Sequence, residues 1–218
     1  MKKSNGFQVN NKVLLFLNGE VPEIIPNTKD YEMIFCTDGA LNYLEKLNIK
    51  PNIISGDFDS VNANKISDDI EIIATPNQED TDFAKALDII IDKGFKNVDV
   101  FGASGKQQDH FLGNLNAAYR FKEKLEIVFY DNYSTYFFAK NNTLLEGYFG
   151  RTISLLPFPD CKKITTIGLE FALNEEDLNL LSRIGTRNRA IDDKIEIKFK
   201  EGNLIIFIMN QEYPILLA

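Results

Sequence analysis

The stretch PNIISGDFDS, residues 51–60, joins a short apolar run to two carboxylates, Asp57 and Asp59, that stand two positions apart. The apolar run is typical of a buried strand, and the glycine and acids after it are typical of the loop in which a strand ends. Two carboxylates about 5 Å apart repel each other by roughly 3 kcal/mol at an effective dielectric constant of about 20. The pair therefore needs a compensating group, and a bound cation would supply one.

Similar apolar runs lie on both sides of this strand. Together the predicted strands occupy residues 12–18, 32–37, 51–55, 70–75, 97–102 and 125–131. Helical patterns separate several of them, with apolar faces predicted at Leu41, Leu44 and Leu47, at Phe83, Leu87 and Ile90, and at Leu112, Leu115 and Tyr119. Strands that alternate with helices predict a mostly parallel sheet with helices on both faces. We therefore expect a doubly wound α/β domain over residues 1–135.

The remainder of the chain has a different pattern, which is strand-like. Residues 152–159, 162–173 and 194–209 read as strands, and the last segment carries a hairpin signal with its turn at 201–203. Residues 174–185 fit either a loop or a short helix. We expect a second, all-β domain over residues 136–218, in the form of a small β-sandwich.

Composition excludes several classes of protein. The net charge of −8, with lysines and arginines scattered along the 218 residues, argues against a nucleic-acid partner. The apolar run at 13–17 is too short for a membrane helix, and no signal peptide precedes it. Cys36 and Cys161 provide neither a disulfide framework nor metal-ligand spacing. We expect a cytoplasmic protein with two reduced thiols and no membrane association.

Four polar clusters follow the predicted strands. Asp38 follows the second strand, Asp57 and Asp59 the third, Gln78 and Asp82 the fourth, and Asp109 the fifth. Ligands of open α/β sheets bind beyond the carboxyl ends of the strands, so these side chains are predicted to meet at one rim. Asp57 and Asp59 point to the same side of an extended segment. Together with Asp82 they suit Mg²⁺, which prefers oxygen ligands and substrate phosphates.

The loop that follows the fifth strand predicts a phosphate site. Gly102 and Gly105 precede a helix whose amino-terminal amides attract anions, and Lys106 adds a positive charge. The loop matches neither a Walker A motif nor the GxGxxG fingerprint. Lys85 fits either a solvated helix position or one that reaches the rim. His110, the only histidine, fits a structural role better than a catalytic one.

The motifs TDGA, SGDFDS, NQEDTDFAKAL and GASGKQQDHFLGNL, in this order, resemble those of the thiamine pyrophosphokinase family. The later stretches IGLEFAL and GTRNRA are similar to its C-terminal domain. The resemblance implies an enzyme that transfers a diphosphate group from ATP to thiamine with Mg²⁺, giving thiamine diphosphate and AMP. It implies a homodimer built from an ATP-binding α/β domain and a β-sandwich, with thiamine in a cleft between subunits.

The resemblance also implies roles for particular residues. Those expected at the reaction centre are Asp57, Asp59, Gln78, Asp82 and Asp109, of which Asp57, Asp59 and Asp82 would hold Mg²⁺. Those expected to bind ATP are Asp38, Gly39, Ser60, Thr81, Lys85, Gly102, Ser104, Gly105 and Lys106. Those expected to bind thiamine are Gln78, Asp82, Phe171, Arg187 and Asn188.

The sequence departs from the family pattern at two places. The family stretch GGRxDH reads GKQQDH here, with Lys106 and Gln107 in place of a glycine and an arginine, and Arg187 replaces a serine. Three alternative functions stay open. They are a haloacid dehalogenase-like phosphatase with Asp57 as nucleophile, a sugar-nucleotide transferase that holds its metal with residues 57–59, and a non-catalytic nucleotide sensor.

Overall fold

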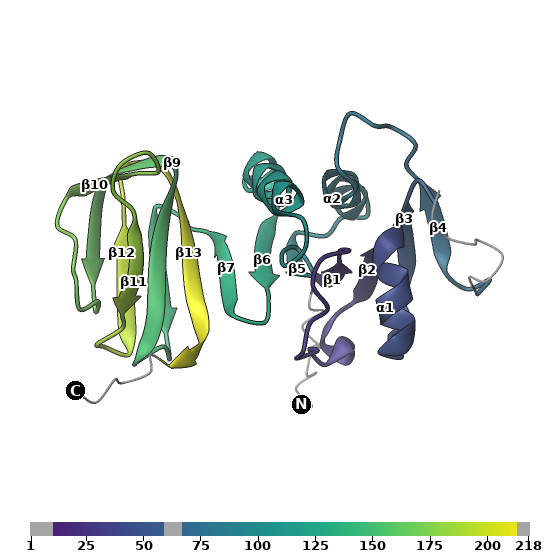
Figure 1. Ribbon diagram of the computed structural model, residues 1–218, viewed down its shortest axis with the longest axis horizontal. Coiled ribbons are helices and arrows are strands. Elements are labelled where there is room, and N and C mark those ends of the chain that lie inside the picture. Colours follow the sequence, from purple (N-terminus) through teal and green to yellow (C-terminus); the bar gives the residue numbers. More distant parts are fainter. Residues whose placement is uncertain (1–10, 59–66, 213–218) are drawn as a thin grey trace, which may run out of the picture. The chain divides into compact units, whose positions relative to one another are not determined.

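The computed structural model describes residues 11–58 and 67–212 (Figure 1). These residues fall into two compact units that divide after Asp131. The first unit combines strands with helices, and the second consists of strands. The mixed α/β architecture predicted from the sequence is therefore confirmed. Within the described ranges, no helix is both long and apolar enough to cross a lipid bilayer.

A six-stranded sheet forms the centre of the first unit. Its strands are β1 (Lys12–Phe16), β2 (Met33–Thr37), β3 (Ile53–Gly56), β4 (Glu71–Ala74), β5 (Asn97–Phe101) and β6 (Glu126–Tyr130). They lie in the order β4-β3-β2-β1-β5-β6, and every neighbouring pair is parallel. All six predicted strands are present, and the strand order reverses direction between β1 and β5.

Short helical segments connect these strands. They are η1 (Thr28–Asp30), η2 (Asp38–Ala40), α1 (Leu41–Lys46), α2 (Asp82–Asp92) and α3 (Gln108–Phe121). Tyr43 of α1 contacts the edge of Phe16, on the face that β1 shares with Cys36. Phe83 of α2 contacts Phe129 of β6 on the opposite face. Helices therefore cover both faces of the sheet, because alternate residues of each strand point to opposite sides.

Helix α3 departs from the predicted pattern of burial. Leu115 is buried as expected, but Leu112 and Tyr119 are exposed. The buried stripe instead contains Leu115, Ala118 and Phe121, which follow one another at intervals of three residues. The predicted apolar face shares Leu115 with the buried stripe but is rotated from it around the helix axis by about one residue. The apolar face predicted for α2 is correct, since Phe83, Leu87 and Ile90 are all buried.

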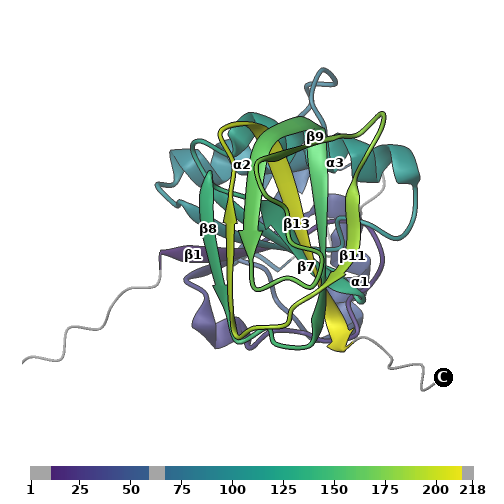
Figure 2. The ribbon, with the colours of Figure 1, turned by 90° about the vertical axis from the view of Figure 1, so that its left-hand side faces the viewer.

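The second unit is built around one long strand. Its strands are β7 (Ser134–Phe138), β8 (Asn142–Glu146), β9 (Arg151–Ile167), β10 (Glu176–Asn179), β11 (Gly185–Arg189), β12 (Lys194–Lys198) and β13 (Glu201–Glu212). Strand β9 pairs antiparallel with β10, β11, β12 and β13 (Figure 2). Residues 174–185, predicted as a loop or a short helix, instead form β10 and the turn after it. The core beneath these strands is aliphatic and includes Leu155, Ile164, Ile195, Leu204 and Ile206.

The hairpin predicted for residues 194–209 is wrong. Strands β12 and β13 both pair with β9 and run along it in the same direction, since Lys198 lies opposite Thr165 and Glu201 lies opposite Lys162. In the described residues no ladder joins β12 to β13; β12 pairs with β8, whereas β13 pairs with β7. Gly202, with φ +87°, lies where a Cβ would come within 2.3 Å of the Asp160 carbonyl oxygen. The glycine thus lets the chain pass close to β9 and continue, and it does not reverse the chain.

Candidate functional site

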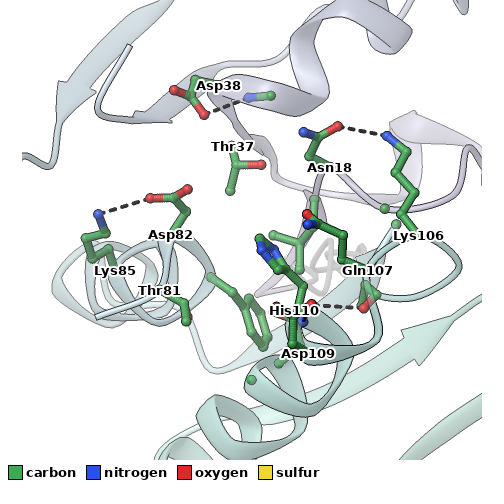
Figure 3. Close-up of a pocket in the computed structure, with 18 of the residues that line it drawn as sticks. Asn18, Thr37, Asp38, Thr81, Asp82, Lys85, Lys106, Gln107, Asp109 and His110 are labelled. Carbon is green, nitrogen blue, oxygen red and sulfur yellow. Dashed lines mark hydrogen bonds and ion pairs between the residues drawn. The ribbon is translucent and has the colours of Figure 1, made fainter. Parts of the chain in front are cut away.

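A pocket of about 640 Å³ opens in the first unit, beyond the carboxyl ends of its strands (Figure 3). The loops after β1, β2, β3, β4 and β5 all contribute to its lining. It includes the crevice between β1 and β5, where the strand order reverses, which is the usual ligand position in open α/β sheets. Of the predicted site residues, it brings together Asp38, Gly39, Asp57, Gln78, Thr81, Asp82, Lys85, Gly102, Ser104, Lys106 and Asp109.

Two glycines allow the loops after β1 and β5 to touch. The Gly19 N–H donates to the Gly102 carbonyl at 2.7 Å. A Cβ on Gly19 would lie 2.2 Å from that carbonyl oxygen, and a Cβ on Gly102 would lie 2.3 Å from the Leu17 carbonyl oxygen. Gly102 also has φ +70°, which side chains disfavour. The floor of the pocket at the switch point is therefore made of closely packed backbone.

Asp38 joins the ends of two neighbouring strands. Its Oδ1 accepts a hydrogen bond from the Gly39 N–H at 2.6 Å, and its Oδ2 accepts one from the Phe58 N–H at 3.0 Å. Gly56 makes room for the carboxylate, because a Cβ there would lie 2.4 Å from Asp38 Cγ. These bonds hold the loops after β2 and β3 in a fixed relation. Asp38 does not cap a helix, since Thr37 occupies the N-cap position of η2.

The acids of the rim interact electrostatically. Burial raises the pKa of Asp38 most, and the negative charges of Asp82 and Asp57 raise the pKa further, against the two backbone hydrogen bonds that lower it. Asp59 and Ser60 lie outside the described residues. Among residues 11–58 and 67–212, no three His, Cys, Asp or Glu side chains are grouped to hold a metal ion. The described part of the predicted magnesium site consists of Asp57 and Asp82, a pair of hard oxygen donors that a divalent cation suits.

The loop between β4 and α2 is tied to its surroundings by side chains. Thr81 caps α2, since its Oγ1 accepts from the Ala84 N–H at 3.2 Å. Asp80 pairs with Arg120 of α3 at 2.6 Å. The Lys85 ammonium group, also on α2, donates to the carbonyls of Thr75 at 3.0 Å and Asn77 at 2.9 Å. It lies in addition 3.0 Å from Asp82 Oδ1 (Figure 3). Lys85 therefore reaches the rim and is not a solvated helix residue.

The amino end of α3 faces the pocket. Lys106 donates to Asn18 Oδ1 at 3.0 Å, and Asp109 Oδ1 accepts from the His110 N–H at 3.0 Å. The side chains of Gln107 and His110 point toward the middle of the pocket (Figure 3). Gln107 occupies the N-cap position and makes no side-chain capping bond. This end of the helix combines a positive backbone dipole with one lysine.

The predicted thiamine residues of the second unit also lie together. Asn188 is buried, and its amide brackets the backbone of Phe171: Oδ1 accepts from the Phe171 N–H at 3.0 Å, and Nδ2 donates to the Phe171 carbonyl at 2.7 Å. The Phe171 ring is exposed. Arg187 has φ +56°, and its N–H donates to Ser154 Oγ at 2.9 Å. Asn188 thus fixes the backbone that carries an exposed aromatic side chain.

The sequence predicts no role in the site for several residues that line the pocket, although His110 and Gln107 stand out in it for other reasons. Asn18 and Gly19 follow β1 and line the pocket, as do Asp80, Gln107 and His110. The dipeptide Asn-Gly directly after the first strand was the available signal, since β1 flanks the point where the strand order reverses. Gly105, predicted to bind ATP, does not line the pocket; it lies against Glu20, whose Cβ would be 2.4 Å from a Cβ at this position.

Two family models match the chain in sequence. The model described as thiamin pyrophosphokinase, catalytic domain, matches residues 27–129. The model described as thiamin pyrophosphokinase, vitamin B1 binding domain, matches residues 141–204. The first range contains all the strand-end acids of the pocket, and the second contains Phe171, Arg187 and Asn188.

Named relatives and solved structures agree with these matches. Thiamine pyrophosphokinase of Bacillus subtilis is 25% identical over 196 residues, covering 85% of this chain and 91% of that protein. A crystal structure of the Bacillus subtilis enzyme superimposes with a TM-score of 0.77 at 24% identity, covering 90% of this chain and 98% of the other. The crystal structure of a thiamin pyrophosphokinase family protein from Enterococcus faecalis superimposes with a TM-score of 0.79 at 19% identity, covering 92% of this chain and 100% of the other.

Proposed function

The chain belongs to the thiamin pyrophosphokinase family, and from this premise we propose how its residues carry out the reaction. The activity is that of an ATP:thiamine diphosphotransferase. The first unit binds ATP and contains the reaction centre, whereas the second unit contributes to thiamine binding. We take the two units to be separate domains, a doubly wound α/β domain and a β-sandwich in which the long strands β9 and β12–β13 take part in both layers.

One observation carries the proposal: a single pocket at the strand-order switch point gathers acids from the ends of β2, β3 and β4 opposite the amino end of α3. Phosphoryl-type transfer is catalysed mainly by positioning and by stabilising charge. The acidic side suits a divalent cation, and the helix end with Lys106 suits phosphate oxygens. An ATP polyphosphate chain requires both kinds of surroundings.

The donor set of the rim fits magnesium. Burial raises the pKa of Asp38 most, and the negative charges of Asp82 and Asp57 raise it further, which indicates that carboxylates are concentrated here. Asp57 and Asp82, with Asp59 from outside the described residues, would hold the ion. When bound, Mg²⁺ would neutralise phosphate charge and polarise the diphosphate group. Asp38, whose two oxygens are engaged by backbone N–H groups, fixes the loops that carry the ligands.

The remaining pocket residues receive roles by position. Gly39, Thr81, Gly102 and Ser104 belong to the proposed ATP site. Ser60, outside the described residues, and Gly105, which does not line the pocket, are assigned to the same site from the family resemblance alone. Gln78 and Asp109 both line the pocket, Gln78 from the β4–α2 loop and Asp109 from the first turn of α3. We assign both to the reaction centre, where they would orient the thiamine hydroxyl against the phosphate. Lys85 receives a different role, which is described in the next subsection.

We assign thiamine binding to Gln78, Asp82 and, in the second unit, Phe171, Arg187 and Asn188. The exposed Phe171 ring, held by Asn188, offers a face that attracts the cationic thiazolium ring. We further propose that the enzyme is a homodimer in the cytoplasm, where the two free, buried cysteines stay reduced. Sedimentation should then give twice 24.8 kDa; a monomer with full activity would contradict the dimer.

The experiment that tests the function is incubation with ATP, Mg²⁺ and thiamine, followed by separation of the nucleotides and thiamine esters. The proposal predicts AMP and thiamine diphosphate in equal amounts. ADP with thiamine monophosphate would show transfer of a single phosphate group and would contradict it. Binding of ATP without any turnover would favour the nucleotide sensor. The phosphatase alternative loses support because of the position of Asp57. This residue follows β3, the neighbour of the edge strand β4, whereas that alternative calls for a nucleophile after a central strand.

A further inference from the structure

We propose that Lys85 is a positioning residue, which holds the loop between β4 and α2 and orients the Asp82 carboxylate, and is not a ligand of the ATP phosphates. The inference rests on the proposed function in so far as Asp82 acts in the reaction centre. It concerns residues 75–82, the segment that carries Gln78, Asp80 and Thr81 into the pocket.

The donors of Lys85 are already engaged. A lysine ammonium group has three N–H donors and no acceptor. Three oxygens surround this one: the Thr75 carbonyl at 3.0 Å, the Asn77 carbonyl at 2.9 Å and Asp82 Oδ1 at 3.0 Å. The side chain is only 11% exposed. A phosphate oxygen at this ammonium group would have to compete with two hydrogen-bonded carbonyls and the paired Asp82 carboxylate.

These contacts close the loop on itself. Lys85 lies in the first turn of α2, and its own N–H donates to the Thr81 carbonyl at 3.0 Å. Its side chain reaches back over the loop to the carbonyls of Thr75 and Asn77, the first and third residues after β4. The amino end of α2 and the end of β4 are thereby joined through one side chain. The buried position makes each charge-assisted hydrogen bond stronger than the same bond in water.

The orientation of Asp82 follows from the same contacts. Asp82 is the first residue of α2, and the ion pair between Lys85 and its Oδ1 restrains the rotation of its carboxylate. The cation lies beside a carboxylate that already faces the negative charges of Asp38 and Asp57. Lys85 therefore stabilises the ionised rim before any ligand arrives. Misplacing a catalytic group by about 1 Å can lower a rate roughly a hundredfold.

A matched control lies on the same helix. Lys93, the C-cap of α2, also joins the helix to β4, since its ammonium group contacts Glu71 Oε1 at 3.0 Å and Oε2 at 2.9 Å. It lies at the other end of the helix, away from the pocket. Lys85→Met and Lys93→Met each remove one ammonium group from α2 and keep most of the aliphatic stem. Only the first removes the contacts to the loop.

The first measurement is amide hydrogen exchange of the substrate-free protein. In Lys85→Met, the amides of residues 77–81, among them the Glu79 N–H that donates to Asn77 Oδ1 at 2.9 Å, should exchange at least about tenfold faster, because the loop opens locally, while the strands keep their protection. Lys93→Met should leave residues 77–81 unchanged. Unchanged exchange of this loop in Lys85→Met would overturn the proposal. The measurement needs no substrate, so its outcome is independent of whether the proposed function holds.

The second measurement is a double-mutant cycle on turnover with ATP and thiamine. Lys85→Met should lower kcat by about tenfold to a hundredfold, with the KM for ATP changed by less than about threefold. In an Asp82→Asn background the same substitution should have little further effect, because both changes act on one carboxylate. Additive losses, or a loss confined to the KM for ATP, would overturn the proposal. If Lys85→Met does not fold, Lys85→Gln, which also removes the ammonium group but keeps a polar side chain, replaces it in both measurements with the same expected outcomes.

Discussion

Asn18 accepts a hydrogen bond at 3.0 Å from the ammonium group of Lys106, although 88 positions separate the two residues. The bond joins the loop after β1 to the loop before α3 across the point where the strand order reverses. The Asn18 side chain also lies against Gly39, where a Cβ would come within 2.4 Å of Asn18 Nδ2. The loops after β1, β2 and β5 thus meet at one asparagine.

Lys106 should supply the charge that family members obtain from an arginine. One of its three donors is engaged by Asn18, and the side chain is exposed at the pocket. Lys106→Ala should lower turnover by about a hundredfold, which is typical of removing one group that stabilises transition-state charge. The affinity for thiamine should change little. Adding Gln107→Arg should recover part of the lost turnover. Steady-state kinetics with varied ATP would measure the loss and the recovery. Turnover within about twofold of the parent enzyme would show that Lys106 is only a surface residue.

Gly102 should tolerate no side chain, whereas Gly94 should tolerate one. Both have positive φ, +70° and +87°, so alanine costs about 1 kcal/mol at either position from backbone strain alone. A Cβ on Gly102 would additionally lie 2.3 Å from the Leu17 carbonyl oxygen, whereas a Cβ on Gly94 meets nothing within 4 Å. Urea unfolding should therefore show a much larger loss of stability for Gly102→Ala. Equal losses would contradict the close packing of the two loops.

The buried carboxylate of Asp99 should stabilise the first unit through its two partners. Its Oδ2 accepts from the Tyr31 hydroxyl at 2.6 Å and pairs with the Lys12 ammonium group at 2.6 Å. Asp99→Ala removes a charged acceptor from both partners, of which Lys12 is partly exposed to solvent, so it should lower the free energy of unfolding by about 2 kcal/mol. Tyr31→Phe should cost about 1 kcal/mol. The control Asp88→Ala, at an exposed position of α2, should stay within about 0.5 kcal/mol of the parent; a comparable loss there would refute this account.

The two cysteines should be unreactive in the native protein. Burial, more than the nearby Asp160 charge, raises the pKa of Cys161 to about 12, and burial also raises the pKa of Cys36. With raised pKa values both thiols stay protonated at pH 8, and a protonated thiol is unreactive because the reactive form is the thiolate. Ionisation of Cys161 destabilises the folded state as the pH rises above the ordinary thiol pKa of 9.0 toward 12. A disulfide reagent at pH 8 should label neither cysteine until denaturant is added. Rapid labelling of the folded protein would contradict their burial.

The sequence predicts the first unit better than the second. Each strand of the parallel sheet is an apolar run that ends in turn residues, so local patterns suffice to find it. The path of β12 and β13 depends on register along β9, whose paired residues lie 29 to 61 positions earlier in the chain, and no local pattern contains this register. The sequence Glu201-Gly202-Asn203 has turn chemistry, yet the glycine serves a close approach to the Asp160 carbonyl.

The site shows the same division. The acids after β2, β3 and β4 are predicted because carboxylates at strand ends have a chemical meaning. Asn18 is not predicted, because its position matters only once β1 is known to flank the point where the strand order reverses. The role of Lys85 likewise depends on two backbone carbonyls, at Thr75 and Asn77, whose position the sequence does not express.

The most direct test of the central claim, that the acids of this rim bind the cation used in diphosphate transfer, is turnover of Asp82→Asn as a function of magnesium concentration. The control is Asp88→Asn, which changes an exposed acid one and a half turns further along α2. We predict that Asp82→Asn loses at least about a hundredfold in kcat, needs more magnesium to reach half its maximum rate, and unfolds at the same urea concentration as the parent. Asp88→Asn should match the parent in all three. Parent-like turnover of Asp82→Asn with an unchanged magnesium midpoint would contradict the account.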